Sequence, residues 1–134
     1  MKITISRKGH FSAAHKLYNN YWNHEKNIKI FGKCAYYHGH NYKYIVSITG
    51  KINVETGFVL NLQNLKKILF EEIETIFDHK NINLDLKEFS SINPTAENIV
   101  IFMWNKINKR ISSDLDLKIT LYETENNFVE YDGK

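Results

Sequence analysis

Two stretches of the chain alternate between apolar and polar residues with a period of two, which is typical of half-buried β-strands. From Lys2 to His15, the apolar residues occupy odd positions: Ile3, Ile5, Phe11 and Ala13. From His38 to Gly50, the even positions include Tyr42, Tyr44, Val46 and Ile48. Residues two apart in a strand point to the same face. Unless a bend near Gly9 interrupts the first strand, His15 ends its apolar face, and His38 and His40 begin that of the second.

Two later stretches have the period of an amphipathic helix. Asn61 can cap the first helix, whose apolar stripe is Leu62, Leu65, Leu69, Ile73 and Ile76 and which we expect to end near Phe77. Thr95 is the expected N-cap of the second, whose apolar side is Ile99, Phe102, Met103 and Ile107 and which ends around Arg110. Between them, Asp78 to Asn93 lacks a clear period, so we expect a connection with at most short turns.

The remaining strands lie near the end of the chain. Leu117, Ile119 and Leu121 share one face of a third strand, and Glu123 continues that parity. A fourth strand is expected at 128–131. The order strand, strand, helix, helix, strand, strand predicts an α+β fold, a four-stranded antiparallel sheet with two helices on one face. With 134 residues and no repeat or linker, residues 1–134 are expected to form a single domain.

Composition narrows the class of protein. Hydrophobic residues make up 43% and charged residues 25%, which is usual for a globular protein. The formal charge of +3 is small and the basic residues are scattered, so we expect no nucleic-acid partner. No apolar run approaches the roughly 20 residues that span a bilayer. The one cysteine cannot form an internal disulfide and no signal-like segment follows Met1, so a cytoplasmic location without a membrane partner is expected.

Three histidines form a candidate metal site. His38 and His40 point to one face of their strand, and pairing of the two strands brings His15 beside them. Three protein ligands with an open fourth position are typical of catalytic zinc. The alternative is that a His-x-His pair and one further histidine occur by chance at the surface. His10 and His24 have no comparable arrangement, and we interpret both as ordinary histidines.

Four further residues could carry chemistry. Cys34 lies four residues before His38, where a neighbouring Lys33 and a dication would favour its thiolate, although a single cysteine is often only a small hydrophobic residue. Asp78 and His79 follow the first helix, and a carboxylate can orient an imidazole, but adjacent residues do not face each other in regular structure. Glu123 either receives paired N–H donors from a ligand or lies in water at the strand end.

These motifs together resemble the 6-pyruvoyltetrahydropterin synthase and 6-carboxytetrahydropterin synthase family across nearly the whole chain. The matching stretches are Phe11-Ser-Ala-Ala-His15, Phe31-Gly-Lys-Cys34, His38-Gly-His-Asn-Tyr42, Gly57-Phe-Val-Leu-Asn-Leu62, Asp78-His-Lys-Asn81, Pro94-Thr-Ala-Glu-Asn98 and Tyr122-Glu-Thr-Glu-Asn-Asn127. Their order and separation make a chance match implausible, and they favour the zinc interpretation of the three histidines.

The resemblance implies a role for each candidate residue. Zn2+ is bound by the three histidines, Cys34 removes a proton from the substrate, and Asp78 with His79 relays protons. Glu123 anchors the pterin ring, and we also expect Thr95 to contact the substrate. The resemblance further implies the tunnelling fold, in which trimers close a barrel and two trimers stack into a homo-hexamer. Its sites lie between subunits, so Cys34 could meet the Asp-His pair of another chain.

The resemblance leaves two reactions of 7,8-dihydroneopterin triphosphate open. Three residues separate Cys34 from His38, a spacing that resembles the carboxy branch, where five are usual in the pyruvoyl branch. Our hypothesis is therefore loss of acetaldehyde and triphosphate to give 6-carboxy-5,6,7,8-tetrahydropterin, in the queuosine pathway. The alternative is elimination of triphosphate alone to give the pyruvoyl product, in the tetrahydrobiopterin pathway. The stretches around Cys34, Asn61 and Glu123 resemble that second branch.

Two other functions were weighed against these reactions. A non-catalytic zinc-binding or pterin-binding protein needs neither Cys34 nor the Asp78 and His79 pair, so their presence argues against it. Relatives inferred to perform aldol cleavage of dihydroneopterin usually carry Glu at the position of the base. Cys34 disfavours this reaction.

Overall fold

The computed structural model describes residues 1–134 as an α+β fold built on one five-stranded sheet. Its strands are β1 (Lys2–His15), β2 (His38–Lys51), β3 (Lys80–Asn81), β4 (Asp116–Tyr122) and β5 (Phe128–Tyr131), in the order β3-β1-β2-β4-β5. β3 pairs parallel with Ala13 and Ala14 of β1, whereas the other pairs are antiparallel. The prediction of four antiparallel strands is therefore wrong, because a two-residue strand has no alternation that sequence could reveal.

The pairing of β1 with β2 is the longest feature of the sheet. It runs without interruption from Lys2 opposite Lys51 to His15 opposite His38, so no bend occurs at Gly9. A side chain at Gly9 would collide with the ring and hydroxyl of Tyr44 on the facing strand. Glycine at this position lets the tyrosine lie flat over the first strand, and it leaves the register of the pair unbroken.

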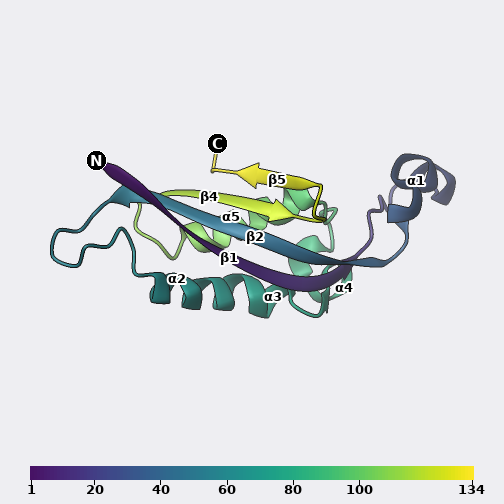
Figure 1. Cartoon of the computed structure of the whole chain (residues 1–134). Helices are drawn as coiled ribbons and strands as arrows, with labels where there is room; N and C mark the ends of the chain where they lie inside the picture. Colours follow the sequence, from purple (N-terminus) through teal and green to yellow (C-terminus); the bar gives the residue numbers. More distant parts are fainter.

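The helices cover one face of the sheet, as Figure 1 shows. They are α2 (Leu62–Leu69), continued by a π-helical turn (Phe70–Glu74) and α3 (Thr75–Phe77), then α4 (Ile82–Asp85), a 3-10 turn (Lys87–Phe89) and α5 (Ala96–Asn108). Both predicted caps are confirmed. The Asn61 side chain accepts a hydrogen bond from Gln63 N at 2.9 Å, and Thr95 Oγ1 accepts one from Asn98 N at 3.2 Å.

The hydrophobic core lies between the helices and the sheet. It contains most of the inward residues of β1, β2 and β4 that the alternation predicted, together with much of the apolar sides of α2 and α5; Ile3 and Leu62, which were also predicted on these faces, are exposed. The other face of the sheet is polar, and hydroxyls such as those of Ser6 and Ser47 pair across the strands at 2.8 Å. The three histidines point to the same face of the sheet as the core residues, the face that the helices cover, and they lie at one end of the sheet.

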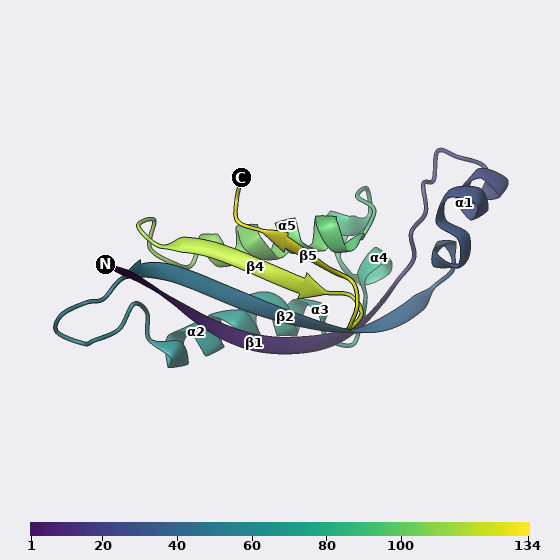
Figure 2. The same ribbon diagram turned by 45° about the horizontal axis from the view of Figure 1, so that its top comes forward.

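One helix was not predicted. α1 (His24–Phe31) stands off the end of the sheet between β1 and β2, followed by a 3-10 turn (Gly32–Ala35) (Figure 2). Asn23 caps it, and the fully buried Asn27 ties it to Asn19 through two hydrogen bonds of 2.7 and 3.0 Å. Hydrogen bonds of polar side chains, rather than an apolar stripe, therefore hold α1 in place. No helix of the structure is both long and apolar enough to cross a membrane.

Candidate functional site

His15, His38 and His40 converge at the end of the β1–β2 pair. His15 lies directly opposite His38, and His40 lies opposite Ala13. One ligand atom from each ring lies within 4.8 Å of the others, and the ring centroids are 4.6 to 5.1 Å apart. The predicted convergence is therefore confirmed as geometry. It follows from strand parity and register, because all three residues occupy the inward face of neighbouring strands.

Backbone carbonyls orient two of these rings. Nδ1 of His15 lies 2.7 Å from the carbonyl oxygen of Pro94, and Nδ1 of His38 lies 2.7 Å from that of Tyr36. A ring that donates through Nδ1 keeps a lone pair on Nε2, as metal ligation requires. Nε2 of His40 is buried and has no hydrogen-bond partner. A buried polar atom without a partner is costly, and a cation bound at this point would satisfy it. The three residues thus fit a zinc ion.

The electrostatics of the cluster favour neutral rings. Burial lowers the pKa of His15 to about 4, and the hydrogen bond to Pro94 opposes this shift only in part. Burial also lowers the pKa of His40, while the carboxylate of Glu123 acts in the opposite direction. Both rings are therefore uncharged at neutral pH, which is the form that binds metals.

Glu123 and Thr95 share a hollow beside the cluster. β4 ends at Tyr122, and the backbone N–H of Glu123 donates to the carbonyl oxygen of Asn127 across the following turn at 3.0 Å, yet the Glu123 side chain stays on the inward face that the alternation predicted. Its side chain is only 27% exposed, and Oε2 lies 3.9 Å from Nε2 of His15. The hollow of about 240 Å³ includes both Glu123 and Thr95. A planar ligand held by the carboxylate would therefore reach the histidines.

Asp78 and His79 form a pair within one chain. Nδ1 of His79 lies 3.0 Å from Oδ2 of Asp78, because the loop after α3 places His79 at a φ of 60°. Both residues are fastened to β1: Ser12 N donates to Oδ1 of Asp78 at 2.9 Å, and His79 N donates to Ser12 O at 2.7 Å. The bond from Ser12 and the contact with His79 lower the pKa of the Asp78 carboxyl. The pair is solvent-exposed.

Cys34 lies apart from these groups in its contacts. It occupies the 3-10 turn after α1, its side chain is exposed, and its carbonyl accepts a hydrogen bond from Leu17 N at 2.7 Å. No hydrogen bond or ion pair joins Cys34 to the histidine cluster or to Asp78 and His79. The structure of one chain thus brings together the three histidines with Glu123, and Asp78 with His79, but does not join Cys34 to either group.

Several residues of the site were not foreseen from sequence. Pro94 and Tyr36 orient two histidines through main-chain oxygens, and Ser12 positions Asp78 through its backbone N–H. Main-chain contacts carry no residue-type signal. The Tyr42 hydroxyl lies 3.4 Å from Nδ1 of His15, and strand parity with His38 and His40 could have indicated this neighbour.

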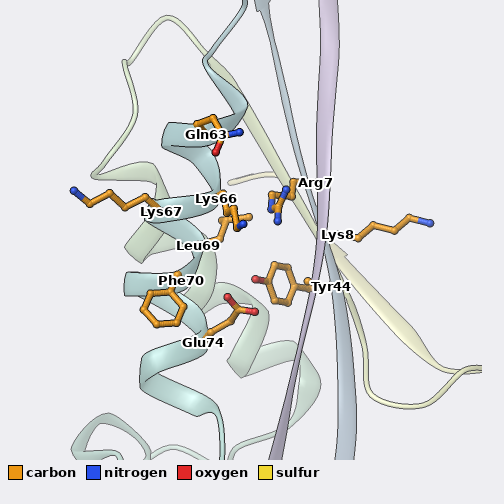
Figure 3. Close-up of a pocket in the computed structure, with 10 residues that line it drawn as sticks. Arg7, Lys8, Tyr44, Gln63, Lys66, Lys67, Leu69, Phe70 and Glu74 are labelled. Atoms are coloured by element: carbon orange, nitrogen blue, oxygen red, sulfur yellow. The ribbon is translucent and has the colours of Figure 1, made fainter.

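A second hollow lies between β1 and α2, away from the histidines. In Figure 3, Arg7 and Glu74 point into it and the Tyr44 hydroxyl is directed toward the helix, whereas Lys8 and Lys67 point away. Its volume is about 370 Å³, and no residue of the histidine cluster lines it. Its lining includes the basic residues Arg7, Lys8, Lys66 and Lys67 and one carboxylate, that of Glu74.

Comparisons with known proteins are consistent across the whole chain. The model of the family described as 6-pyruvoyl tetrahydropterin synthase matches residues 4–134. A 6-pyruvoyl tetrahydrobiopterin synthase of Pongo abelii is 42% identical over 132 residues, which are 97% of this chain and 91% of the relative. The structure of 6-pyruvoyl tetrahydropterin synthase from Caenorhabditis elegans has a TM-score of 0.93 and 34% identity, and the match covers 100% of this chain and 97% of that one.

The comparisons also bear on the two reactions. A 6-carboxy-5,6,7,8-tetrahydropterin synthase of Rickettsia typhi is 30% identical over 146 residues, covering 96% of this chain and 99% of the relative. The pyruvoyl relative is closer in sequence than this carboxy relative. The comparisons therefore favour the pyruvoyl alternative over the carboxy hypothesis that the spacing of Cys34 and His38 suggested.

Proposed function

Since this chain belongs to the 6-pyruvoyl tetrahydropterin synthase family, we propose that it is a zinc-dependent lyase. Its substrate is 7,8-dihydroneopterin triphosphate, and the reaction releases triphosphate and forms 6-pyruvoyl tetrahydropterin. The observation that carries this proposal is the three-histidine cluster beside a hollow that contains a carboxylate. Together they offer one position for a metal and one for a ring with N–H donors.

His15, His38 and His40 would hold the zinc ion through their free ring nitrogens. When bound there, zinc would supply Lewis-acid chemistry, lowering the pKa of side-chain hydroxyls of the substrate. The protein's own contribution is orientation. The carbonyls of Pro94 and Tyr36 set the tautomer of two rings, and the register of β1 and β2 sets their spacing. With three protein ligands, a zinc ion held there would keep a position for the substrate.

Glu123 is the proposed anchor of the pterin ring. An ionised carboxylate accepts two parallel hydrogen bonds, and the pyrimidine edge of a pterin presents adjacent N–H donors. Because Glu123 lies 3.9 Å from His15, this pairing places the substrate side chain next to the cluster. Thr95 lines the same hollow, but its Oγ1 also caps α5, so its role toward the substrate is secondary.

Cys34, Asp78 and His79 are the proposed proton-transfer groups. A base removes a proton from the side-chain carbon next to the ring, and protonation of the ring then reduces it while that carbon becomes a carbonyl. Removal of a proton from the next carbon breaks the bond between the last carbon and the triphosphate oxygen, and the resulting enol takes up a proton to give the second carbonyl. Cys34 acts as this base in its thiolate form. Asp78 holds His79 through Nδ1 and stabilises its charged form, so that His79 can return a proton from its exposed ring.

Assembly would unite these groups. The free edge of β1 is paired with β3 at Ala13 and Ala14 and is bonded to Asp78 and His79 at Ser12, so residues 2–11 present open hydrogen-bonding positions. Long open edges are usually covered in native proteins. A homo-hexamer built from two trimers would cover this edge and could bring Cys34 of one chain to the Asp-His pair of another. Light scattering tests this, and a fully active monomer would contradict the shared site.

The deciding experiment is product analysis. Purified zinc-loaded protein is incubated with 7,8-dihydroneopterin triphosphate, and the products are identified by mass spectrometry. The expected result is 6-pyruvoyl tetrahydropterin with one triphosphate per turnover and no acetaldehyde. A sample pretreated with a chelator is the control and should be inactive. Absence of triphosphate release from the zinc-loaded protein would refute the proposal.

A second candidate is 6-carboxytetrahydropterin synthesis, favoured by the three-residue spacing between Cys34 and His38. The structure explains how so short a link can be accommodated, since a single 3-10 turn leads through the buried Ala35 directly to β2. The same incubation separates the two reactions. Acetaldehyde released in equal amount with triphosphate would identify the carboxy product.

A further inference from the structure

A hollow of about 480 Å³ is lined by chain neighbours of the histidine cluster. It shares no lining residue with the hollow that contains Glu123. Three segments that hold the histidines also form its wall. Lys16 follows His15, Tyr37 precedes His38, and the carbonyl of Pro94 orients His15. A ligand whose reacting carbons lie at the cluster could therefore extend a tail into this space.

The charge of this hollow is of one sign. Lys16 is the only charged side chain in its lining, and no aspartate or glutamate contributes to it. The other lining residues are tyrosines, asparagines and serines with a few apolar groups. Lys16 forms no ion pair in the structure. The hollow in Figure 3 differs, because Glu74 points into it opposite Arg7. The hollow with Lys16 thus combines an unpaired cation with neutral hydrogen-bonding groups.

Both the backbone and the side chain of Lys16 are held by specific contacts. Its backbone N–H donates to Oδ1 of Asn83 at 2.9 Å, and its carbonyl accepts from Nδ2 of the same residue at 3.1 Å. Its Nζ lies 4.8 Å from the ring centroids of both Tyr18 and Tyr37. Aromatic faces attract a cation without neutralising it. The ammonium group is thus held in place while its charge remains available to a ligand.

We propose that this hollow binds the phosphate tail of the substrate, with Lys16 as the cation that contacts it. The identity of the ligand rests on the proposed function, whereas the preference for a phosphorylated anion rests on the lining residues. Ser91 and Asn20 also line the hollow, and their side chains make no hydrogen bond in the structure, so both can donate to phosphate oxygens. The tail would leave through this hollow after the carbon–oxygen bond breaks.

The test compares ligands with and without phosphate by titration calorimetry. The variant is Lys16→Gln, and Lys67→Gln is the matched control, since it removes the same charge from a side chain that points into solvent in Figure 3. Lys16→Gln should weaken binding of dihydroneopterin triphosphate about tenfold, the effect of one charge-assisted hydrogen bond. Binding of unphosphorylated dihydroneopterin should change less than twofold. Lys16→Arg should retain most of the affinity, and the control should behave as the wild type.

Inorganic triphosphate serves as a second probe that does not depend on the pterin. Weaker binding of triphosphate to Lys16→Gln than to wild type would support the phosphate hollow even if neither protein bound a pterin, a result that would refute the proposed function alone. Two results for Lys16→Gln would overturn the role of Lys16, provided that its circular dichroism matches the wild type. One is an equal loss of affinity for both pterins, and the other is no loss of affinity for either dihydroneopterin triphosphate or inorganic triphosphate. That outcome would leave the proposed function intact if the wild type still released triphosphate.

Discussion

The histidine cluster and the Asp78–His79 pair both adjoin β1, through His15 in the cluster and through hydrogen bonds to Ser12 in the pair, yet they are built in opposite ways. The cluster is covered by helices, and its rings come from the inward faces of two long paired strands. The pair lies on a loop at the edge of β1, and its His79 side chain is 85% exposed. The residues that we propose as metal ligands are thus carried by paired strands of the sheet, whereas those that we propose to transfer protons are exposed to water.

The two regions also differ in how their charge state is controlled. Burial keeps His15 and His40 neutral by lowering their pKa values. At the edge, a hydrogen bond from Ser12 lowers the pKa of the Asp78 carboxyl and keeps it ionised, so that it can support a charged imidazole. Desolvation thus keeps the proposed metal ligands neutral, and hydrogen bonding keeps the carboxylate of the proposed proton relay ionised. Four changes separate these roles.

The largest effect is expected from the cluster itself. His40→Ala removes one of three ligands, so zinc content should fall from about one ion per chain to near zero and nearly all activity should be lost. His10→Ala is the control, because His10 faces the other side of the sheet and is exposed. Metal analysis and steady-state rates check both variants. Full zinc content in His40→Ala would show that these histidines are not the metal site.

Cys34→Ala should separate chemistry from metal binding. We expect kcat to fall about a thousandfold, within the range for loss of a general base, while zinc content and pterin affinity remain at the wild-type level. The Cys34 side chain is exposed and makes no hydrogen bond, so the fold should be unaffected. Cys34→Ser is the matched variant, because the serine side chain is similar in size but its hydroxyl is a much weaker acid than a thiol. Loss of zinc in Cys34→Ala would instead identify the thiol as a ligand.

The metal-free protein should lose stability in acid because of His15. Its pKa is about 4 in the folded state, below the ordinary 6.5, so the neutral ring favours folding above pH 6.5 and this contribution is lost between pH 6.5 and 4. Over that range the folding equilibrium should shift by a few hundredfold at most, at one factor of ten per pKa unit. Urea unfolding at several pH values measures this. In His15→Gln the slope over this range should be flatter, and an unchanged slope would contradict the assignment.

The smallest effect is expected at the exposed pair. Asp78→Asn removes the charge that supports His79 but can keep the bond from Ser12, so kcat should fall only about tenfold, the magnitude of one charged hydrogen bond. Zinc content should not change. Glu88→Gln, in the 3-10 turn Lys87–Phe89, controls for loss of an exposed negative charge. If Asp78→Asn has the activity of the wild type, the pair takes no part in the reaction. If it loses zinc, the pair and the histidine cluster do not have separate roles.

Local patterns in the sequence account for much of the fold and the cluster. Strand parity placed His15, His38 and His40 on the core face, and the register of β1 and β2 confirms it. The caps at Asn61 and Thr95 were predicted because a side chain and a backbone N–H two or three residues away interact wherever a helix begins. Such features depend only on neighbours in the chain, so a periodic pattern suffices to reveal them.

Tertiary structure alone decided the features that depend on distant segments. The carbonyl that orients His15 comes from Pro94, 79 residues later, and Asn83 holds Lys16 across 67 residues. β3 has two residues, too few for any alternation, and α1 is held by the buried polar Asn27 rather than an apolar stripe. Main-chain hydrogen bonds and turns between distant segments leave no periodic trace, whereas a repeating apolar face does.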